Sequence, residues 1–169
     1  LGRVRELKTF TLMLEAIKLM PAAERPKLII AGDGIRENEV RELMLNAIES
    51  DGIEADVSGA FTPDQFQELV KQLDVMFAIY PPERGNILQG ALPVKMFDAA
   101  ANGVPSVVNS GCLMGEIAET EEIGKAVEWN DAQAACDALL ELKNKTVELT
   151  ITSQREKEKF LSTVLPLID

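Results

Sequence analysis

The chain contains no histidine, and this absence removes a large part of protein chemistry. Histidine is the commonest general base near neutral pH and a frequent zinc ligand. It is also the usual partner that activates a serine or cysteine nucleophile. A metal site would need carboxylates alone, and the acidic residues do not follow the spacing of a calcium-binding loop. We therefore expect no resident metal or cofactor.

Cysteine is also scarce, with only Cys112 and Cys136, which fit no metal-ligand spacing. We interpret them as free, half-buried thiols of a cytoplasmic protein. No apolar run approaches the ~20 residues of a membrane span, and no signal-peptide pattern is visible. Membrane association is expected only through a further domain of the polypeptide.

Positive charge is the third shortage. The sequence has 17 Lys and Arg against 28 Asp and Glu, a net charge of −11. Such a chain repels nucleic acid unless its basic residues gather in one place, so we expect no nucleic-acid partner. The few places where cations do gather become informative.

Short apolar runs alternate with amphipathic stretches along the 169 residues. Alternating strands and helices predict an α/β fold, a Rossmann-like doubly wound parallel sheet with helices on both faces. We expect one domain over residues 1–169, with 144–169 as a C-terminal helical extension. The predicted strands are 27–32, 55–60, 74–80, 105–109 and 125–129, and the predicted helices include 7–17, 40–48, 65–73, 93–102, 132–142 and 154–165.

The start of the chain, Leu1-Gly2-Arg3, is typical of the end of a strand. A first, central strand is then nearly absent. We expect the sequence to be part of a longer polypeptide with a further N-terminal domain.

In open α/β sheets, ligands bind beyond the carboxyl ends of the first and fourth strands. The loop after the first strand carries Arg3, Arg5 and, at the start of the next helix, Lys8. Arginine offers a planar fork to phosphate oxygens and lysine a point charge. The alternative is a solvated turn with ordinary surface charges.

The loop after the fourth strand, 81–92, is longer than the usual strand–helix connection, and such loops are often functional. Glycines let backbone amides approach a ligand, and the helix that opens near Pro93 presents free N–H groups to an anion. Asp98, one turn on, is either a ribose ligand or an ordinary surface carboxylate. The residues predicted to bind the ligand are Gly2, Gly85, Asn86, Ile87, Leu88, Gly90, Lys95 and Asp98.

A second glycine turn, Gly32-Asp33-Gly34, also lies between a predicted strand and a helix. It matches the start of a dinucleotide-binding GxGxxG loop, but Glu37 occupies the third glycine position. An acidic residue there disfavours an NAD-binding domain. We interpret the two glycines as turn residues.

Taken together, residues 1–143 resemble the C-terminal domain of GT-B glycosyltransferases, in particular the retaining group 1, or family 4. The Gly2-Arg3 turn with Lys8 five residues later resembles the start of that domain. Gly32-Asp33-Gly34 resembles the family's G-x-G turn, Val57-Ser58-Gly59 the end of its next strand, and 73–82 the strand and loop that follow. The most specific match is 93–108, PVKMFDAAANGVPSVV, which resembles the signature helix P-x-K-x-x-E-x-x-A-x-G-x-P-V-V.

The resemblance implies a domain that binds a nucleotide diphosphate sugar for glycosyl transfer, without a metal. It implies that Arg3 and Lys8 are the catalytic residues that hold the donor diphosphate, and that Asp98 binds the ribose. It also implies that an N-terminal domain of the same polypeptide binds the acceptor. The family pattern has a second acidic residue, which contacts the sugar, eight positions before Asp98, where this chain has Gly90. A degenerate, non-catalytic nucleotide-binding or interaction module and a nucleotide-sugar epimerase therefore stay open as alternatives.

Overall fold

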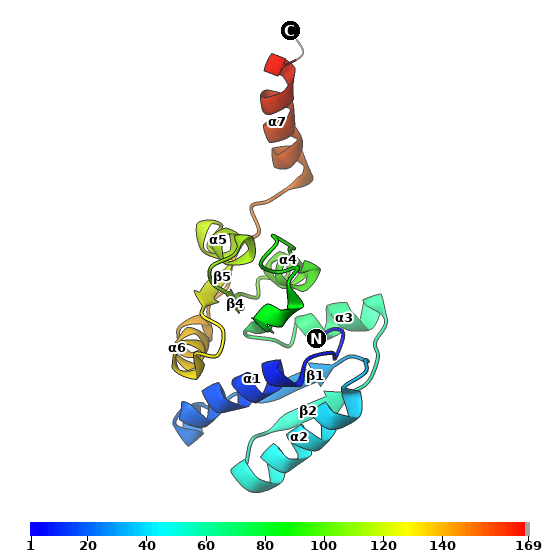
Figure 1. Ribbon diagram of the computed structural model, residues 1–169, viewed down its shortest axis with the longest axis vertical. Coiled ribbons are helices and arrows are strands. Elements are labelled where there is room, and N and C mark those ends of the chain that lie inside the picture. The colour runs from blue at the N-terminus through cyan, green and yellow to red at the C-terminus, as the bar shows by residue number, and fades with distance from the viewer. Residues whose placement is uncertain (168–169) are drawn as a thin grey trace.

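The computed structural model describes residues 1–167 and is an α/β domain with parallel strands flanked by helices (Figure 1). Strands β1 (Leu28–Ala31) and β2 (Ala55–Ser58) pair in parallel, and β3 (Met76–Ala78), β4 (Ser106–Asn109) and β5 (Gly124–Val127) form a second parallel sheet. The predicted fold class is confirmed, and each predicted strand is present; the first four are shorter than predicted, and the fifth begins one residue earlier and ends two residues earlier. The sheet is nevertheless divided into β1–β2 and β3–β4–β5, with no strand between them among residues 1–167.

Helices connect the strands in the predicted alternation. Thr62 accepts a hydrogen bond from the Gln65 N–H and forms a capping box before Pro63, as the Thr-Pro pair predicts. Asp131 caps a later helix in the same way. The helices are α1 (Leu7–Leu19), α2 (Glu37–Asp51), α3 (Pro63–Val70), α4 (Val94–Ala101), α5 (Leu113–Thr120), α6 (Ala132–Leu142) and α7 (Ser153–Val164).

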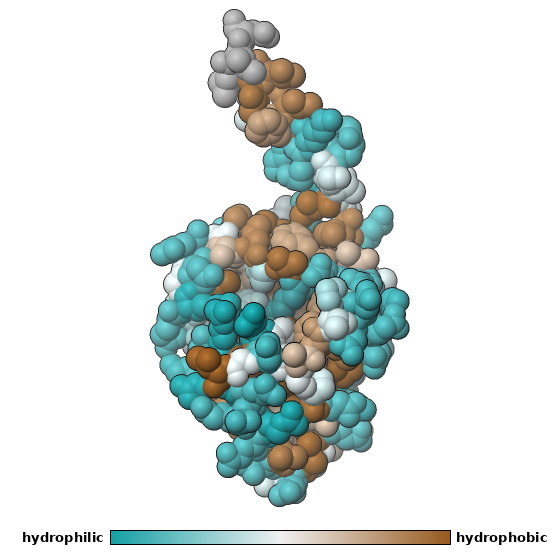
Figure 2. All heavy atoms as spheres, turned by 90° about the vertical axis from the view of Figure 1, so that its right-hand side faces the viewer, coloured by the Kyte–Doolittle hydropathy of each residue, from teal (hydrophilic) through white to brown (hydrophobic). Residues whose placement is uncertain are grey.

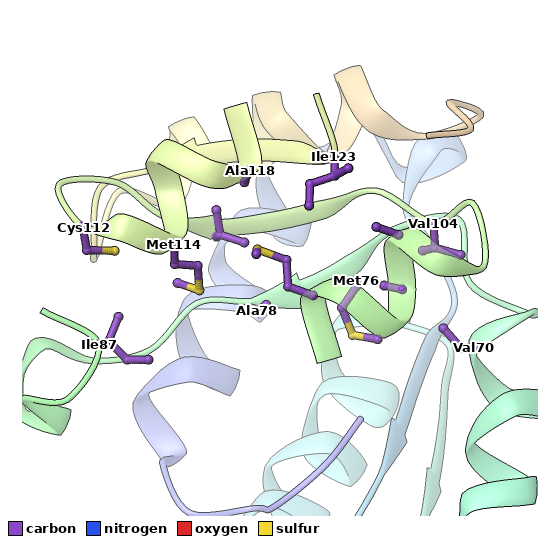
Figure 3. Close-up of a cluster of buried hydrophobic side chains, with 13 residues drawn as sticks. Val70, Met76, Ala78, Ile87, Val104, Cys112, Met114, Ala118 and Ile123 are labelled. Carbon is purple, nitrogen blue, oxygen red and sulfur yellow. The ribbon is translucent and has the colours of Figure 1, made fainter. Parts of the chain in front are cut away.

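The core of the three-stranded sheet is packed on both faces of β4, whose four residues are all buried. Figure 3 shows the cluster on one face, where side chains from β3, α5 and the loop after β3 meet. Met76, Met114 and Ile123 are each at most 1% exposed. This burial holds the carboxyl end of β3 in a rigid frame, which matters because the predicted ligand loop begins there.

The first residues of the chain lie against the end of β1. The Gly2 N–H donates to the Ala31 carbonyl at 3.0 Å, and the Val4 N–H donates to the Asp33 carbonyl at 2.8 Å. Gly32 makes this approach possible, because a Cβ built there would lie 1.7 Å from the Gly2 carbonyl oxygen. These backbone contacts agree with the prediction that Leu1-Gly2-Arg3 forms the end of a strand.

Helix α7 extends away from the rest of the domain (Figures 1 and 2). It is anchored at its base, where the Arg155 guanidinium donates two hydrogen bonds to Glu121 at 2.6 and 2.7 Å. Phe160 in the helix and Leu165 directly after it are largely exposed. Within residues 1–167, no helix has the length and apolar character to cross a membrane.

Candidate functional site

An ion pair joins the two loops in which the strand order predicts a ligand site: the N-terminal loop and the loop after β3. The Lys8 ammonium at the start of α1 lies 2.6 Å from the Glu83 carboxylate in the loop after β3. This hydrogen bond lowers the pKa of Glu83 below its ordinary value. Beside it, the Thr9 hydroxyl donates to the Ile79 carbonyl at 3.3 Å. The N-terminal segment and the loop at 81–93 therefore form one surface at the carboxyl end of β3.

Cations gather at this surface without acidic partners. Arg3, Arg5, Arg84 and Lys95 line one cavity that begins at the first residues of the chain. No carboxylate in residues 1–167 lies within ion-pair distance of any of them. In a chain of net charge −11, uncompensated cations in one place create a local attraction for an anion.

Two of these cations, Arg84 and Lys95, lie close to the ring of Tyr80. The Arg84 guanidinium lies 4.7 Å from the centroid of its ring, and the Lys95 ammonium lies 5.0 Å from it. Both distances are within the range of cation–π attraction. Burial raises the pKa of Tyr80 to about 12, so its hydroxyl stays protonated. Burial, with a smaller contribution from the Arg84 charge, lowers the pKa of Lys95 to about 8.

The loop after β3 turns tightly at Gly85 and Gly90, which have positive φ angles of 39° and 91°. Most of its amides are used inside the loop, as in the bond from the Gly90 N–H to the Ile87 carbonyl at 3.1 Å. Within residues 1–167, the N–H groups of Ile87, Leu88, Leu92, Val94 and Lys95 have no backbone acceptor. Free amides of a loop and of a helix N-terminus together favour an anion.

The predicted binding residues do not all share one cavity. Gly2, Arg3 and Lys95 line it, whereas Lys8 reaches the site through Glu83. The other predicted residues do not line the cavity. Asn86 and Leu88 are exposed, Asp98 is half-buried, and Gly85 and Gly90 form the turns of the loop after β3. Burial raises the pKa of Asp98 above its usual value.

Two of the residues predicted to bind the ligand, Ile87 and Lys95, also have a structural role. The Ile87 side chain points into the core cluster (Figure 3), so only its backbone is available to a ligand. Lys95 turns back toward the sheet and donates to the Phe77 carbonyl at 3.3 Å. Its ammonium therefore lies on the sheet side of α4, away from the free amides at the beginning of that helix.

Sequence reasoning did not single out Arg84 or Tyr80. Arg84 is in the loop that was nominated, but it has no periodic or motif position that distinguishes it from a surface arginine. The contact depends on the 3-10 turn Pro82–Arg84, which brings the guanidinium back over the ring at the end of β3. A tertiary contact of this kind leaves no signal in a single sequence.

The second glycine turn is filled by the chain itself. Gly34, like Gly32, has no room for a side chain, because a Cβ built there would lie 2.1 Å from the Val4 carbonyl oxygen. The backbone that approaches these glycines is residues 2–4 and not a ligand. This supports their interpretation as turn residues. No group of three or more carboxylate or thiol side chains in residues 1–167 is placed to hold a metal ion.

The fold and these loops define a Rossmann-like α/β domain with a cationic ligand edge at the carboxyl end of its strands. The family model of glycosyl transferases group 1 matches residues 1–145, and the chain belongs to that family. No curated protein matches the chain in sequence.

Among solved structures, the chain is similar to the catalytic domain of cholesterol-alpha-glucosyltransferase from Helicobacter pylori. The TM-score is 0.63 at 16% identity, over 84% of this chain and 82% of that one. At this identity the likeness supports the GT-B glycosyltransferase fold and does not extend to the substrate.

Proposed function

We propose that this chain is the donor-binding part of a glycosyltransferase and that it binds a nucleotide diphosphate sugar. The observation that carries the proposal is that Arg3, Arg5 and Arg84, none of them paired with a carboxylate among residues 1–167, line the cavity next to a loop with free backbone amides after β3. A diphosphate supplies the negative charge that would pair with these cations. Arg3 is exposed and free to turn toward it, and Lys8 is held at the same edge by Glu83.

The proposed reaction is transfer of the sugar from the donor to an acceptor hydroxyl. The bond from the anomeric carbon to the diphosphate oxygen breaks, and the acceptor oxygen forms the new bond and gives up its proton. Negative charge grows on the departing diphosphate. Arg3 and Lys8, with the free amides of Ile87, Leu88 and Val94, are suited to stabilise that charge more strongly in the transition state than in the bound donor.

Asp98 is proposed as the acceptor of hydrogen bonds from the ribose. It lies one turn after the free amides that begin α4, a spacing that suits a nucleoside next to its own phosphates. A half-buried carboxylate with no protein partner gains from hydroxyl donors, because burial has removed part of its hydration. We further propose that the acceptor binds to an N-terminal domain of the same polypeptide, that the protein is cytoplasmic, and that any membrane contact belongs to that domain.

A second candidate is a non-catalytic module of the same fold that binds nucleotide without transferring a sugar. It is favoured by Gly90, which stands where a sugar-contacting carboxylate is expected. Within residues 1–167, a Cβ built at Gly90 would meet only the Leu113 side chain, at 3.7 Å. Donor binding without turnover by the full-length protein would support this candidate.

The test is calorimetric titration of the chain with UDP, GDP and their sugar conjugates. We expect one nucleotide diphosphate to bind, and Arg3→Ala and Lys8→Ala each to weaken binding at least tenfold, about 1.4 kcal/mol, as for loss of a charge-assisted hydrogen bond. The matched control is Lys71→Ala, which removes a cation paired with Glu68 on α3. Equal affinity in all four proteins would contradict the proposed site.

A further inference from the structure

The side chain of Asn109, the last residue of β4, makes two hydrogen bonds to the backbone of one residue, Tyr80. The Tyr80 N–H donates to the Asn109 Oδ1 at 2.8 Å, and the Asn109 Nδ2 donates to the Tyr80 carbonyl at 2.9 Å. Asn109 is only 6% exposed, so water competes little for these bonds. A buried carboxamide that binds both polar groups of one backbone residue fixes that residue in place.

These two bonds replace the backbone ladder at the point where β3 leaves β4. The pairing of the two strands ends two residues before Tyr80. The Met76 N–H donates to the Pro105 carbonyl, and a parallel ladder repeats this step every two residues. Continued to Tyr80, the ladder would reach the backbone carbonyl of Asn109. That carbonyl instead accepts from the Cys112 thiol at 3.4 Å, and the Asn109 side chain takes over the bonds to Tyr80.

The residue before Tyr80 is held from another element. Ile79 is 0% exposed, and its carbonyl accepts from the Thr9 hydroxyl of α1. Asn109 from β4 and Thr9 from α1 thus bind two consecutive residues at the end of β3. The loop 81–92 begins directly after them. The direction in which this loop leaves the sheet is therefore set by side-chain hydrogen bonds and not by strand pairing.

Tyr80 connects this fixed backbone to two cations. The centroid of its ring lies 4.7 Å from the Arg84 guanidinium and 5.0 Å from the Lys95 ammonium. The 3-10 turn Pro82–Arg84 begins two residues after Tyr80, so a shift of the Tyr80 backbone displaces the ring and the guanidinium together. A displacement of ~1 Å at a group that contacts the substrate can cost about 10²-fold in rate.

We infer that Asn109 is a positioning residue of the donor site: it holds the Tyr80 backbone and thereby fixes the Arg84 guanidinium where it faces the donor phosphates. Arg84 lines the cavity that Arg3 also lines. The inference rests on the proposed function for the identity of the ligand and on the two Asn109 hydrogen bonds for the positioning. A merely structural asparagine would change stability alone, whereas a positioning residue also changes where the cations lie in the folded protein.

The experiment compares Asn109→Ala with Ile123→Ala in the full chain. Ile123 is 0% exposed and lies directly before β5, at the opposite end of the parallel sheet from Tyr80, so its truncation lowers stability away from the loop. NMR measures the upfield ring-current shifts of the Arg84 and Lys95 side-chain protons near the Tyr80 ring. We expect Asn109→Ala to reduce these shifts by about half or more and Ile123→Ala to leave them unchanged.

Calorimetric titration with UDP and GDP supplies the second readout. We expect Asn109→Ala to bind the nucleotide diphosphate at least about fivefold more weakly than Ile123→Ala does, because the guanidinium is displaced from the phosphates. If Asn109→Ala does not fold, Asn109→Thr takes its place in both measurements. A β-branched residue suits a strand, and threonine lacks the carboxamide.

Unchanged ring-current shifts in the Asn109 variant, or an affinity within about twofold of the Ile123→Ala protein, would overturn the inference. Failure of both Asn109 variants to fold while Ile123→Ala folds would also overturn it, since Asn109 would then be needed for folding itself. If the parent chain binds neither UDP nor GDP, the proposed function fails, while the ring-current shifts still decide whether Asn109 positions the cations.

Discussion

The two halves of the sheet, β1–β2 and β3–β5, differ in how completely their strands are buried. In β4 every residue is buried, with helices on both faces, whereas β2 alternates between half-buried and exposed residues from Ala55 to Ser58. The first is a central strand and the second an edge. A two-stranded sheet is marginal by itself. The β1–β2 half has a core of its own, but that core is made mainly by side chains of α1 and α2 packed on β1, so this half depends on those helices and on the few backbone contacts of residues 2–4.

The largest expected effect compares one methionine from each half. Met96 in α4 and Met44 in α2 are both 0% exposed. We expect Met96→Ala to lower the free energy of unfolding by about 4 kcal/mol and Met44→Ala by about 2, because the surroundings of Met44, in the half with only two strands, relax more easily into the space. Denaturant titration of both variants measures this. A larger loss at Met44 would mean that the β1–β2 half is the tighter one.

The contact between residues 2–4 and β1 is expected to be nearly as sensitive. Gly32→Ala places a methyl group on the Gly2 carbonyl at a backbone φ of +147°, so the two segments must separate. We expect a loss of about 3 kcal/mol from strain and broken hydrogen bonds. Gly59→Ala is the matched control, because its Cβ would meet only the Glu37 side chain at 3.6 Å. Equal thermal stability of the two variants would show that the close approach of Gly2 to Gly32 does not contribute to stability.

The two halves also differ in how far sequence reasoning reached. The strands followed from apolar runs such as 27–32, because a buried strand needs no partner in the sequence to be visible. Helix α5 was missed, since Leu113–Thr120 is short and contains Gly115, which lowers its helical signal. The topology rule singled out the loops after the first and fourth predicted strands, and the Lys8–Glu83 ion pair joins these two loops; that they bind a ligand stays a prediction. Arg84, Tyr80 and the inward turn of Lys95 could not be predicted, because each depends on distances across the fold.

The pH dependence of stability tests the inward turn of Lys95. Its folded pKa of about 8 lies below its ordinary value of 10.5. Between these values the unfolded chain binds more protons than the folded one, so Lys95 makes stability rise with pH, by on the order of 3 kcal/mol. Other groups with raised pKa, such as Tyr80, oppose this rise as they titrate.

Lys95→Met isolates the contribution, because those other groups remain in both proteins. The difference in free energy of unfolding between Lys95→Met and the parent chain should be largest near pH 7 and shrink as the pH rises from 8 toward 10. Guanidinium titrations at several pH values measure this difference. A difference that stays constant across the range would place the ammonium in solvent rather than against the sheet.

The smallest expected effect concerns Glu83, the carboxylate that pairs with Lys8 at the cationic edge. Its ion pair with Lys8 is exposed, with 68% and 64% of the two side chains accessible, and such pairs contribute little to stability. A bound diphosphate must compete with this carboxylate for Lys8. We expect Glu83→Gln to leave stability within about 0.5 kcal/mol and to tighten nucleotide diphosphate binding two- to threefold.

The sugar conjugate distinguishes the two roles that Glu83 can have. If it only neutralises Lys8, the affinity ratio of the nucleotide sugar to the bare diphosphate is the same in Glu83→Gln and in the parent chain. If it replaces the carboxylate missing at Gly90, that ratio falls, because the sugar loses a charge-assisted hydrogen bond while the diphosphate gains a freed cation. Titration of both ligands against both proteins thereby decides whether the β3–α4 loop of this chain still contacts the sugar.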